Sequence, residues 1–389
     1  MAKLSRRQLF IFGGIALGGG IAGAAQGFLF RNYAPSQTAA NPAALNNPNP
    51  SASQPPAPSN TASKVRSSAN LKPAPKGLYA PTRGDVRLVV ISDLNSAYGS
   101  TNYRESVKTA IRLIPDWEPD LVLCGGDMVA AQSLSLNRDE VDAMWQAFDR
   151  YISGPLRAAK LPFGFTVGNH DGSGALSSGG KFTFQTDREA ARTYWRDGLH
   201  DPQINFVDRG DFPFYYTFAQ NEIFYLVWDA STATITKTQL DWAAQALSSK
   251  AAQGAKLRIV IGHLPLYGIA KGRDNYGNFL DDADELRRFL EKYKVHTYVS
   301  GHHHAYYPGH RGKLELLHAG VLGDGPRRLV TGNLPPNHTL TVVDIKLDQA
   351  ETAYTTYDMN TLQVIDQSTL PPVIHAPNGK VYRRDVKET

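Results

Sequence analysis

Five short apolar runs in this chain each stop at an acidic, amide or imidazole residue. The polar residues that follow these runs are Asp93 and Asn95, Asp127, Asn169 and His170, His263, and His302 with His304. A single Gly-Asp or Gly-Asn would mean little, because such dipeptides are common in turns. In open α/β sheets, however, the loops beyond the carboxyl ends of the strands form the ligand crevice. Five strand ends of this kind therefore predict one pocket in which these side chains converge.

The order of the apolar runs also predicts the fold class. In the first half of the folded part, short β-branched runs such as 86–92 alternate with amphipathic segments such as 103–114, whose apolar residues recur every three or four positions. The segment 212–230 instead indicates two antiparallel strands around Gln220-Asn221. The segment 314–365 is mostly β in character. Alternation that turns into hairpins implies one domain with a mixed sheet, or with two packed sheets flanked by helices.

The N-terminal residues have the pattern of a targeting segment. Three basic residues, Lys3, Arg6 and Arg7, precede an uncharged, glycine-rich apolar run over residues 9–30. The stretch SRRQLF resembles the twin-arginine export signal, which serves proteins that fold before they cross a membrane. An uncleaved membrane helix is the alternative, since the run is close to the roughly 20 residues that span a bilayer. Either interpretation puts the domain outside the cytoplasm, in the periplasm or another extracytoplasmic space, free or anchored by residues 9–30.

Composition divides the chain into four parts. Residues 1–30 are expected to form the export signal or membrane anchor. Residues 31–80 are rich in Pro, Ala, Ser and Asn, and this composition predicts a disordered linker because it cannot bury enough apolar surface to offset the ordering entropy. We expect residues 81–370 to form the folded domain and residues 371–389 to form a C-terminal tail.

Cysteine content and charge exclude several classes of function. Cys124 is the only cysteine, so an internal disulfide, a cysteine-cluster zinc site and an iron-sulfur site are all excluded. The formal net charge is +5, of which the N-terminal segment contributes three. No dense basic stripe is present, which argues against nucleic acid as the main partner.

Taken together, the motifs SDLN, GGDM, GNHD, GHLPLYG and GHHH closely resemble those of the calcineurin-like metallophosphoesterase family. The resemblance covers most of residues 86–343. It implies an α/β fold, a four-layer α/β/β/α sandwich of two mixed β-sheets flanked by helices. It also implies two divalent metal ions, drawn from Mn, Fe, Zn or Mg, and a small phosphoester substrate. The implied reaction is hydrolysis of a phosphomonoester or phosphodiester by metal-bound hydroxide.

The resemblance assigns a role to each strand-end residue. The two ligand sets that it implies are Asp93, Asp127 and His304 for one metal, and Asp127, Asn169, His263 and His302 for the other. A carboxylate such as Asp127 can bridge two cations roughly 3.5–4 Å apart and hold a water between them. His170 is implied to contact the phosphate and to assist the leaving oxygen, a role that suits an imidazole because its pKa is close to working pH. If the GHHH segment is extended, His303 points away from the ligands.

Asn95 departs from the family pattern, which has a His two residues after the first Asp. An amide oxygen is a harder and weaker donor than an imidazole nitrogen, so we expect the Asn95 site to hold its metal less tightly and to favour Mn²⁺, Mg²⁺ or Ca²⁺. The related purple acid phosphatases have a Tyr shortly after the Gly-Asp motif, where this chain has Ala130. Tyr98 is close in sequence, and we expect it to be a packing residue.

Other interpretations of these residues are possible. Taken singly, Asp127 could form a turn, Asn169 could adopt a left-handed turn conformation, and His263 could be a hydrogen-bonded strand-end His. Within enzymes, the alternatives are a nucleotidase or a cyclic nucleotide phosphodiesterase. In another class, the alternative is a degenerate, non-catalytic phosphate-ligand binding protein, for which Asn95 is the only support.

Overall fold

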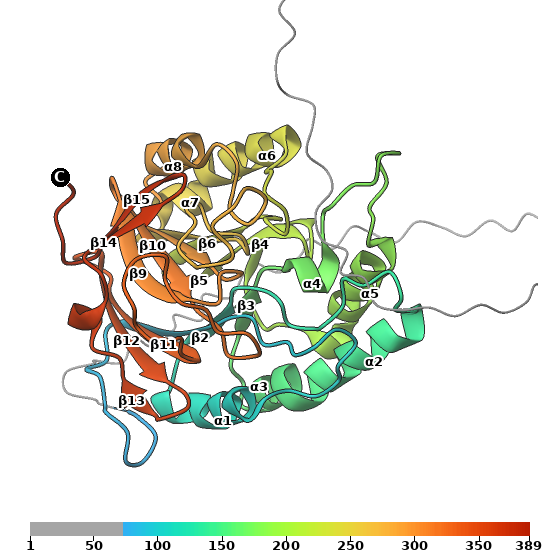
Figure 1. Cartoon of the computed structure of the whole chain (residues 1–389), viewed down its shortest axis with the longest axis horizontal. Helices are drawn as coiled ribbons and strands as arrows, with labels where there is room; N and C mark the ends of the chain where they lie inside the picture. The colour runs from blue at the N-terminus through green and yellow to red at the C-terminus, as the bar shows by residue number, and fades with distance from the viewer. Residues whose placement is uncertain (1–72) are drawn as a thin grey trace, which may run out of the picture. The chain divides into compact units, whose positions relative to one another are not determined.

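Two mixed β-sheets form the centre of the folded part, with helices on both outer sides (Figure 1). The computed structural model describes residues 73–389, so the expected export signal and most of the expected linker lie outside the described residues. The first sheet contains, in spatial order, β13 (Gln363–Val364), β12 (Glu351–Asp358), β11 (Thr339–Lys346), β1 (Val86–Ile91), β2 (Leu121–Cys124) and β3 (Phe163–Phe165). In this sheet β1, β2 and β3 are parallel, and β11, β12 and β13 are antiparallel to their neighbours.

The second sheet has nine strands. In spatial order they are β14 (Val373–Ala376), β15 (Gly379–Arg383), β9 (Tyr306–Arg311), β10 (Leu314–Ala319), β8 (Thr297–Ser300), β7 (Leu257–Ile261), β6 (Ile223–Val227), β5 (Tyr215–Gln220) and β4 (Phe206–Asp211). Its centre, from β10 to β6, is parallel, and the outer pairs are antiparallel. The hairpin predicted around Gln220-Asn221 is confirmed as β5 and β6.

Helices cover both outer faces, as Figure 1 shows. On the side of the first sheet lie α1 (Glu105–Leu113), α2 (Arg138–Phe148) and α3 (Gly154–Ala158), and on the opposite side lie α6 (Lys237–Ser248), α7 (Lys250–Gly254) and α8 (Ala283–Lys292). The short α4 (Asn169–Gly172) follows β3, and α5 (Gln185–Arg196) packs against α2 and α4. The predicted four-layer α/β/β/α arrangement is therefore confirmed. Because both faces of the central strands are covered, all six residues of β1 and all five of β6 are buried.

The domain begins earlier than the expected boundary at residue 81. The guanidinium of Arg87, on β1, is buried and donates hydrogen bonds to the carbonyls of Pro73 and Pro81 and to both carboxylate oxygens of Asp344 on β11. The hydroxyl of Tyr357 donates to the carbonyl of Tyr79. Buried backbone carbonyls need donors, and these contacts hold residues 73–80, the end of the expected linker, against the first sheet.

Residues 371–389, expected to form a C-terminal tail, contain strands β14 and β15, and β15 pairs with β9. Ile374 and Val381 are fully buried, so this short hairpin at the edge of the second sheet contributes an apolar side to the core. The sequence signal was weak because each strand has only four or five residues.

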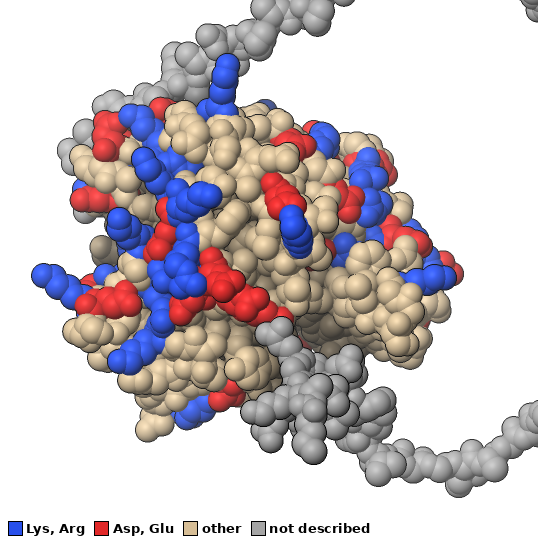
Figure 2. Space-filling view, turned by 90° about the horizontal axis from the view of Figure 1, so that it is seen from above, with Lys and Arg blue, Asp and Glu red and all other residues tan. Residues whose placement is uncertain are grey.

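The described part of the chain has no helix with the length and apolarity needed to cross a bilayer. On the face shown in Figure 2, basic and acidic side chains lie close to one another rather than in large regions of one sign. This surface agrees with the absence of a basic stripe in the sequence.

Candidate metal centre

The carboxyl ends of strands from both sheets meet in one place. Asp93 follows β1, Asp127 follows β2, His263 follows β7, and His302 and His304 follow β8. The backbone N–H of His302 donates to the carboxylate of Asp93 at 3.1 Å, and the N–H of Gly301 donates to the carbonyl of His263 at 3.0 Å. The loops of the two sheets are thus hydrogen-bonded to each other at the site.

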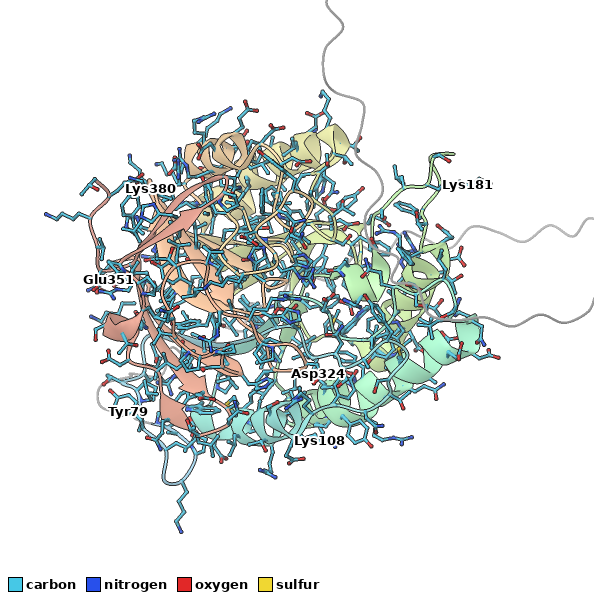
Figure 3. All side chains as sticks on the ribbon, viewed as in Figure 1. Tyr79, Lys108, Lys181, Asp324, Glu351 and Lys380 are labelled. Carbon is cyan, nitrogen blue, oxygen red and sulfur yellow. The ribbon has the colours of Figure 1, made fainter. Side chains whose placement is uncertain are left out.

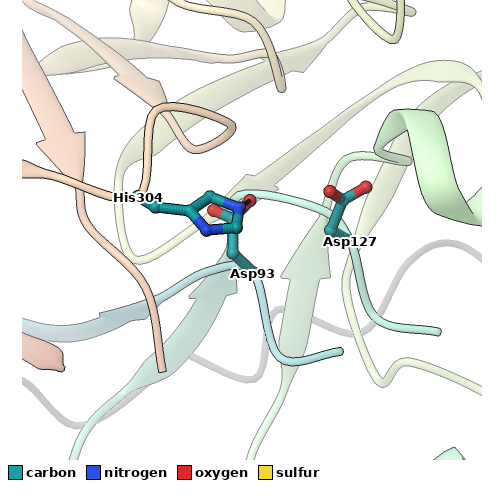
Figure 4. Close-up of side chains that lie close together, drawn as sticks. All are labelled: Asp93, Asp127 and His304. Atoms are coloured by element: carbon teal, nitrogen blue, oxygen red, sulfur yellow. Dashed lines mark ion pairs between the residues drawn. The ribbon is translucent and has the colours of Figure 1, made fainter. Parts of the chain in front are cut away.

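Asp93, Asp127 and His304 form the first of two groups of potential metal ligands. One ligand atom from each lies within 4.8 Å of the others (Figure 4). Asp93 and Asp127 are buried, and the side chain of His304 is 11% exposed. The Nε2 of His304 is 3.2 Å from an oxygen of Asp93, and its Nδ1 is 3.0 Å from the carbonyl of Gly325. That carbonyl accepts only from an Nδ1–H, so a neutral His304 directs its Nε2 lone pair at a carboxylate. A shared cation satisfies two acceptors that face each other.

Asp127, Asn169, His263 and His302 form the second group. The amide Oδ1 of Asn169 is 3.0 Å from Nε2 of His263 and 2.9 Å from Nδ1 of His302. Nε2 of His263 is also 3.3 Å from the Oδ2 of Asp127. Atoms about 3 Å apart can share a cation whose bonds are about 2.0–2.2 Å long. The donor set, with its imidazole nitrogens and carboxylate and amide oxygens, therefore fits a divalent transition ion or Mg²⁺.

Neighbouring hydrogen bonds fix the direction of these ligand atoms. The carbonyl of Gly125 accepts from Nδ1 of His263 at 2.7 Å, which leaves Nε2 facing the group. The Nδ2 of Asn169 donates to Oε1 of Gln132 at 2.6 Å, which turns the Asn169 oxygen towards the two imidazoles. Partners of this kind orient metal ligands and select the histidine tautomer.

The residues of the second group have shifted pKa values that favour a positive charge next to Asp127. Although burial opposes a charge on His263, the carboxylate of Asp127 raises its pKa to about 9. Burial, and then the charge of His263, hold the pKa of His302 well below its ordinary value. Burial alone would raise the pKa of Asp127, but His263 and His170 bring it below the usual range of an aspartate. In the absence of a cation, these pKa shifts favour a positive charge on His263 and a neutral His302.

The structure ties Asn95 to the first group through its backbone. Its N–H donates to the carbonyl of Asp127 at 3.2 Å, and its own carbonyl accepts from the N–H of Asp324 at 3.0 Å. The residue is 6% exposed. No hydrogen bond joins its side chain to another residue between positions 73 and 389, so its role as a ligand stays a prediction.

His170 lies beside the second group at the edge of a cleft. Its Nδ1 is 3.2 Å from the carbonyl of Ala131, and its Nε2 is 3.9 Å from the Oδ2 of Asp127. The cleft has a volume of about 730 Å³, and Asn169, His302 and Tyr98 also line it. Tyr98 is exposed, and its ring centroid is 5.0 Å from that of His170. Tyr98 is therefore part of the cleft wall rather than the core.

Loop 173–184 forms part of the same cleft, which its first residues line. Lys181, labelled in Figure 3, lies near the outer tip of this loop, which projects from the body of the domain. Loops vary more between related proteins than the strands that they connect, and they often carry the residues that bind the substrate. Loop 173–184 is therefore a candidate determinant of substrate specificity.

The basis of one prediction is wrong, although its result holds. Residues 301–304 are not an extended strand, and both His302 and His304 have positive φ angles, of 63° and 51°. His303 nevertheless faces away from the ligands. Its Nδ1 accepts from the N–H of Ile269 at 3.1 Å, and its Nε2 donates to the carbonyl of Asn278 at 2.9 Å. His303 thus anchors the loop that carries Asn278, a function that the sequence did not indicate.

Sequence reasoning also missed three residues around the ligands. Gln132 orients Asn169, while Arg273 and Asn278 approach the Nε2 of His302, at 3.0 and 3.3 Å. All three lie in loops of no recognisable motif, and no pattern in the sequence could have found them.

Comparisons with known proteins give the family of the chain and structures that it resembles. The family model described as calcineurin-like phosphoesterase matches residues 86–306. Among solved structures, the chain is similar to purple acid phosphatase PPD1 from yellow lupin (Lupinus luteus) seeds, with 18% identity and a TM-score of 0.51 over 72% of this chain and 52% of that one. It thus spans about half the length of the lupin protein. It is also similar to GAP50, the anchor in the inner membrane complex of Plasmodium, with 11% identity and a TM-score of 0.47 over 78% of this chain and 90% of that one. A comparison with curated protein sequences finds no match.

Proposed function

The chain belongs to the calcineurin-like phosphoesterase family, and from this premise we propose that it hydrolyses phosphoester bonds with two divalent cations outside the cytoplasm. The observation that carries the proposal is the position of Asp127. Its carboxylate lies within ligand distance of His263 on one side and belongs, on the other, to the group of Asp93 and His304. A carboxylate shared by two ligand groups is the arrangement that a two-metal site requires.

Bound cations would neutralise charge on the phosphoryl group and acidify the attacking water. The residues of the chain do the rest. Asn169 and His302 hold one side of the site, and Asp93 and His304 hold the other. His170 presents Nε2 to the cleft, because its Nδ1–H is held by the carbonyl of Ala131. From there it can give a proton to the departing oxygen.

Asp171 fixes the turn that carries His170. Its carboxylate accepts from the backbone N–H groups of Met128, Val129 and Gly168, at 2.7 to 2.9 Å. Burial, and then the charge of Asp127, raise the pKa of Asp171 to about 7, against the three donors that favour its ionised form. Through these three hydrogen bonds, the side chain of Asp171 joins the loop after β2 to the loop after β3.

The proposal is tested by reconstitution of the full chain. We expect the purified protein, stripped by a chelator and reloaded with Mn²⁺, Zn²⁺, Fe²⁺ or Mg²⁺, to hydrolyse an aryl phosphate monoester or diester. Asp127→Asn should lose both the bound metal and the turnover, because it removes the charge common to both groups. The absence of bound metal in the wild-type chain, together with no turnover for any cation, would refute the proposal.

The extracytoplasmic location rests on the pattern of residues 1–30. Arg6 and Arg7 before the apolar run support export through the twin-arginine route. Replacing both by Lys should trap the folded protein in the cytoplasm, as measured by cell fractionation. Unchanged export of that variant would contradict this part of the proposal.

A further inference from the structure

The cleft beside the ligand groups has one permanently cationic side chain, that of Arg273. Its other lining groups are hydroxyls, amides, apolar side chains and the two imidazoles of His170 and His302. Among the lining residues there is no Asp, no Glu and no Lys. A cleft with this lining favours a ligand that carries negative charge.

The guanidinium of Arg273 lies next to the second ligand group. Its Nη1 is 3.0 Å from Nε2 of His302 and 3.1 Å from Oδ1 of Asn278. The other nitrogen of the same imidazole is 2.9 Å from the amide oxygen of Asn169. Arg273 is therefore only one imidazole ring away from the atoms that would hold a cation.

The contact between Arg273 and His302 cannot persist when Nδ1 of His302 is a metal ligand. The proton of a neutral imidazole then sits on Nε2, which becomes a donor and cannot accept from Arg273. The Oδ1 of Asn278, 3.3 Å from Nε2, is the acceptor that this tautomer needs. Asn278 thus orients the ligand, and Arg273 has donors left for another acceptor in the cleft.

A second arginine reinforces the positive charge at this point. The backbone of the Arg273 loop is joined to the segment 327–330 by the hydrogen bonds Lys271 N–H to Arg328 carbonyl, 2.9 Å, and Val330 N–H to Ile269 carbonyl, 2.8 Å. This pairing brings Arg327 close to Gly272, where an added Cβ would be 3.0 Å from Nη1 of Arg327. Burial, and then the charge of Arg273, lower the pKa of Arg327.

Neither arginine has an acidic partner. No carboxylate of residues 73–389 forms an ion pair with Arg273 or with Arg327, and the Nε of Arg327 is buried without a hydrogen-bond partner there. Two guanidinium groups near each other, neither of them in an ion pair, repel one another and favour the binding of an anion.

We propose that Arg273 is a specificity-determining residue, whose guanidinium binds terminal oxygens of the substrate's phosphoryl group and so selects phosphomonoesters over phosphodiesters. The inference deepens the phosphoesterase activity proposed above and rests on it. A monoester carries about −1.5 to −2 charge at neutral pH and has three terminal oxygens. A diester carries a single negative charge and has two terminal oxygens. Either ester can offer two terminal oxygens to the fork of a guanidinium. The monoester gains more from it, because it carries the larger charge and keeps a third terminal oxygen for the cations.

The test compares Arg273→Gln with Lys271→Gln in the full chain. Lys271 is exposed, lies in the same loop and does not line the cleft, so its variant removes the same charge without the contact. Each protein is loaded with Mn²⁺ and assayed with p-nitrophenyl phosphate and bis(p-nitrophenyl) phosphate. Binding of inorganic phosphate is measured by calorimetry as a readout that is independent of turnover.

We expect Arg273→Gln to lower kcat/KM for the monoester by about 10- to 100-fold, the range for a hydrogen bond to a charged group. The diester should lose less than about threefold, since it presents one charge fewer to the guanidinium. Phosphate binding should weaken in step with monoester turnover, and Lys271→Gln should change none of these quantities. Arg273→Lys should fall between wild type and Arg273→Gln, because Lys keeps the charge but lacks the fork.

Equal losses for both esters, or unchanged phosphate binding in Arg273→Gln, would overturn the assignment. These outcomes differ from a failure of the proposed function. If the wild-type chain binds phosphate through Arg273 but turns over neither ester, hydrolysis is refuted and the anion site stands. If both esters are hydrolysed but the ratio of kcat/KM for the monoester to kcat/KM for the diester is the same in wild type and in Arg273→Gln, hydrolysis stands and the role of Arg273 is refuted.

Discussion

Replacing His170 by alanine tests the chemistry of the site separately from its metal binding. His170 and His302 are the imidazoles among the cleft-lining residues, and only His170 lies outside both ligand groups. Its side chain is 14% exposed, and within residues 73–389 the imidazole forms one hydrogen bond, to the carbonyl of Ala131. Water in the cleft can replace that bond, so the loss of stability should be about 1 kcal/mol.

The expected loss of rate depends on the leaving group. A positioned general acid contributes about 10²- to 10⁴-fold, which corresponds to about 2.7–5.4 kcal/mol of activation free energy at about 1.36 kcal/mol for each factor of ten. An alkyl phosphate should show this whole loss in His170→Ala, because an alkoxide must be protonated as it departs. A nitrophenyl phosphate should lose about tenfold or less, since nitrophenolate leaves as an anion and gains little from the acid.

The assay is kcat for the two substrates in metal-loaded wild type, His170→Ala and His200→Ala. His200 is a matched control, because it is a part-buried histidine that stacks on Tyr194 and does not line the cleft. Elemental analysis should show the same metal content in all three proteins. Equal losses for the two leaving groups would refute proton donation and leave His170 a role in positioning the phosphate, and unchanged kcat would remove it from the mechanism.

Two further substitutions test the surroundings of the site, and a third tests the buried ion pair between β1 and β11. Asn95→His should tighten binding at the weaker metal site in a competition titration with a chelator, because an imidazole is the better donor for transition ions. Asn278→Leu should weaken metal binding by about 10- to 100-fold in the same titration, since it removes the partner that orients His302. Arg87→Met should lower the free energy of unfolding by about 3–5 kcal/mol in urea, because it leaves Asp344 charged and buried without its partner. Unchanged values in these titrations would contradict the corresponding assignment.

The convergence of the candidate ligands could be predicted from the sequence because their positions follow from the strands. A buried parallel strand is recognisable from its apolar run, and the residue just after it must lie at the edge where neighbouring strands also end. Asp93, Asp127 and His263 are all of this kind.

Arg273 and Asn278 could not be predicted in the same way. Their positions depend on the course of a long loop between β7 and α8, which three particular contacts fix: the two bonds to His303 and the pairing with segment 327–330. No periodic pattern of residues in the sequence predicts these contacts. The expected course of GHHH was wrong for a related reason, because a left-handed backbone at His302 and His304 is a property of the folded loop.

Four of the candidate ligands have a left-handed backbone. Asp93, Asp127, His302 and His304 all have φ between 51° and 63°, a region that costs a residue with a side chain roughly 1–2 kcal/mol. The loops tolerate this cost because they are packed tightly and bonded to each other, as in the 2.9 Å bond from Asp93 N–H to the Gly126 carbonyl.

Such close packing leaves no room for a side chain at the neighbouring motif positions. A Cβ on Gly168 would lie 2.1 Å from the carboxylate of Asp127, and one on Gly126 would lie 2.7 Å from Nδ1 of His263. Glycine at these positions therefore lets the ligands approach one another, while the buried strands on either side hold the strained backbone in place. The close packing of these loops thus holds the candidate ligands near one another within the fold itself, and the same loops bring His170 and Arg273 to one cleft.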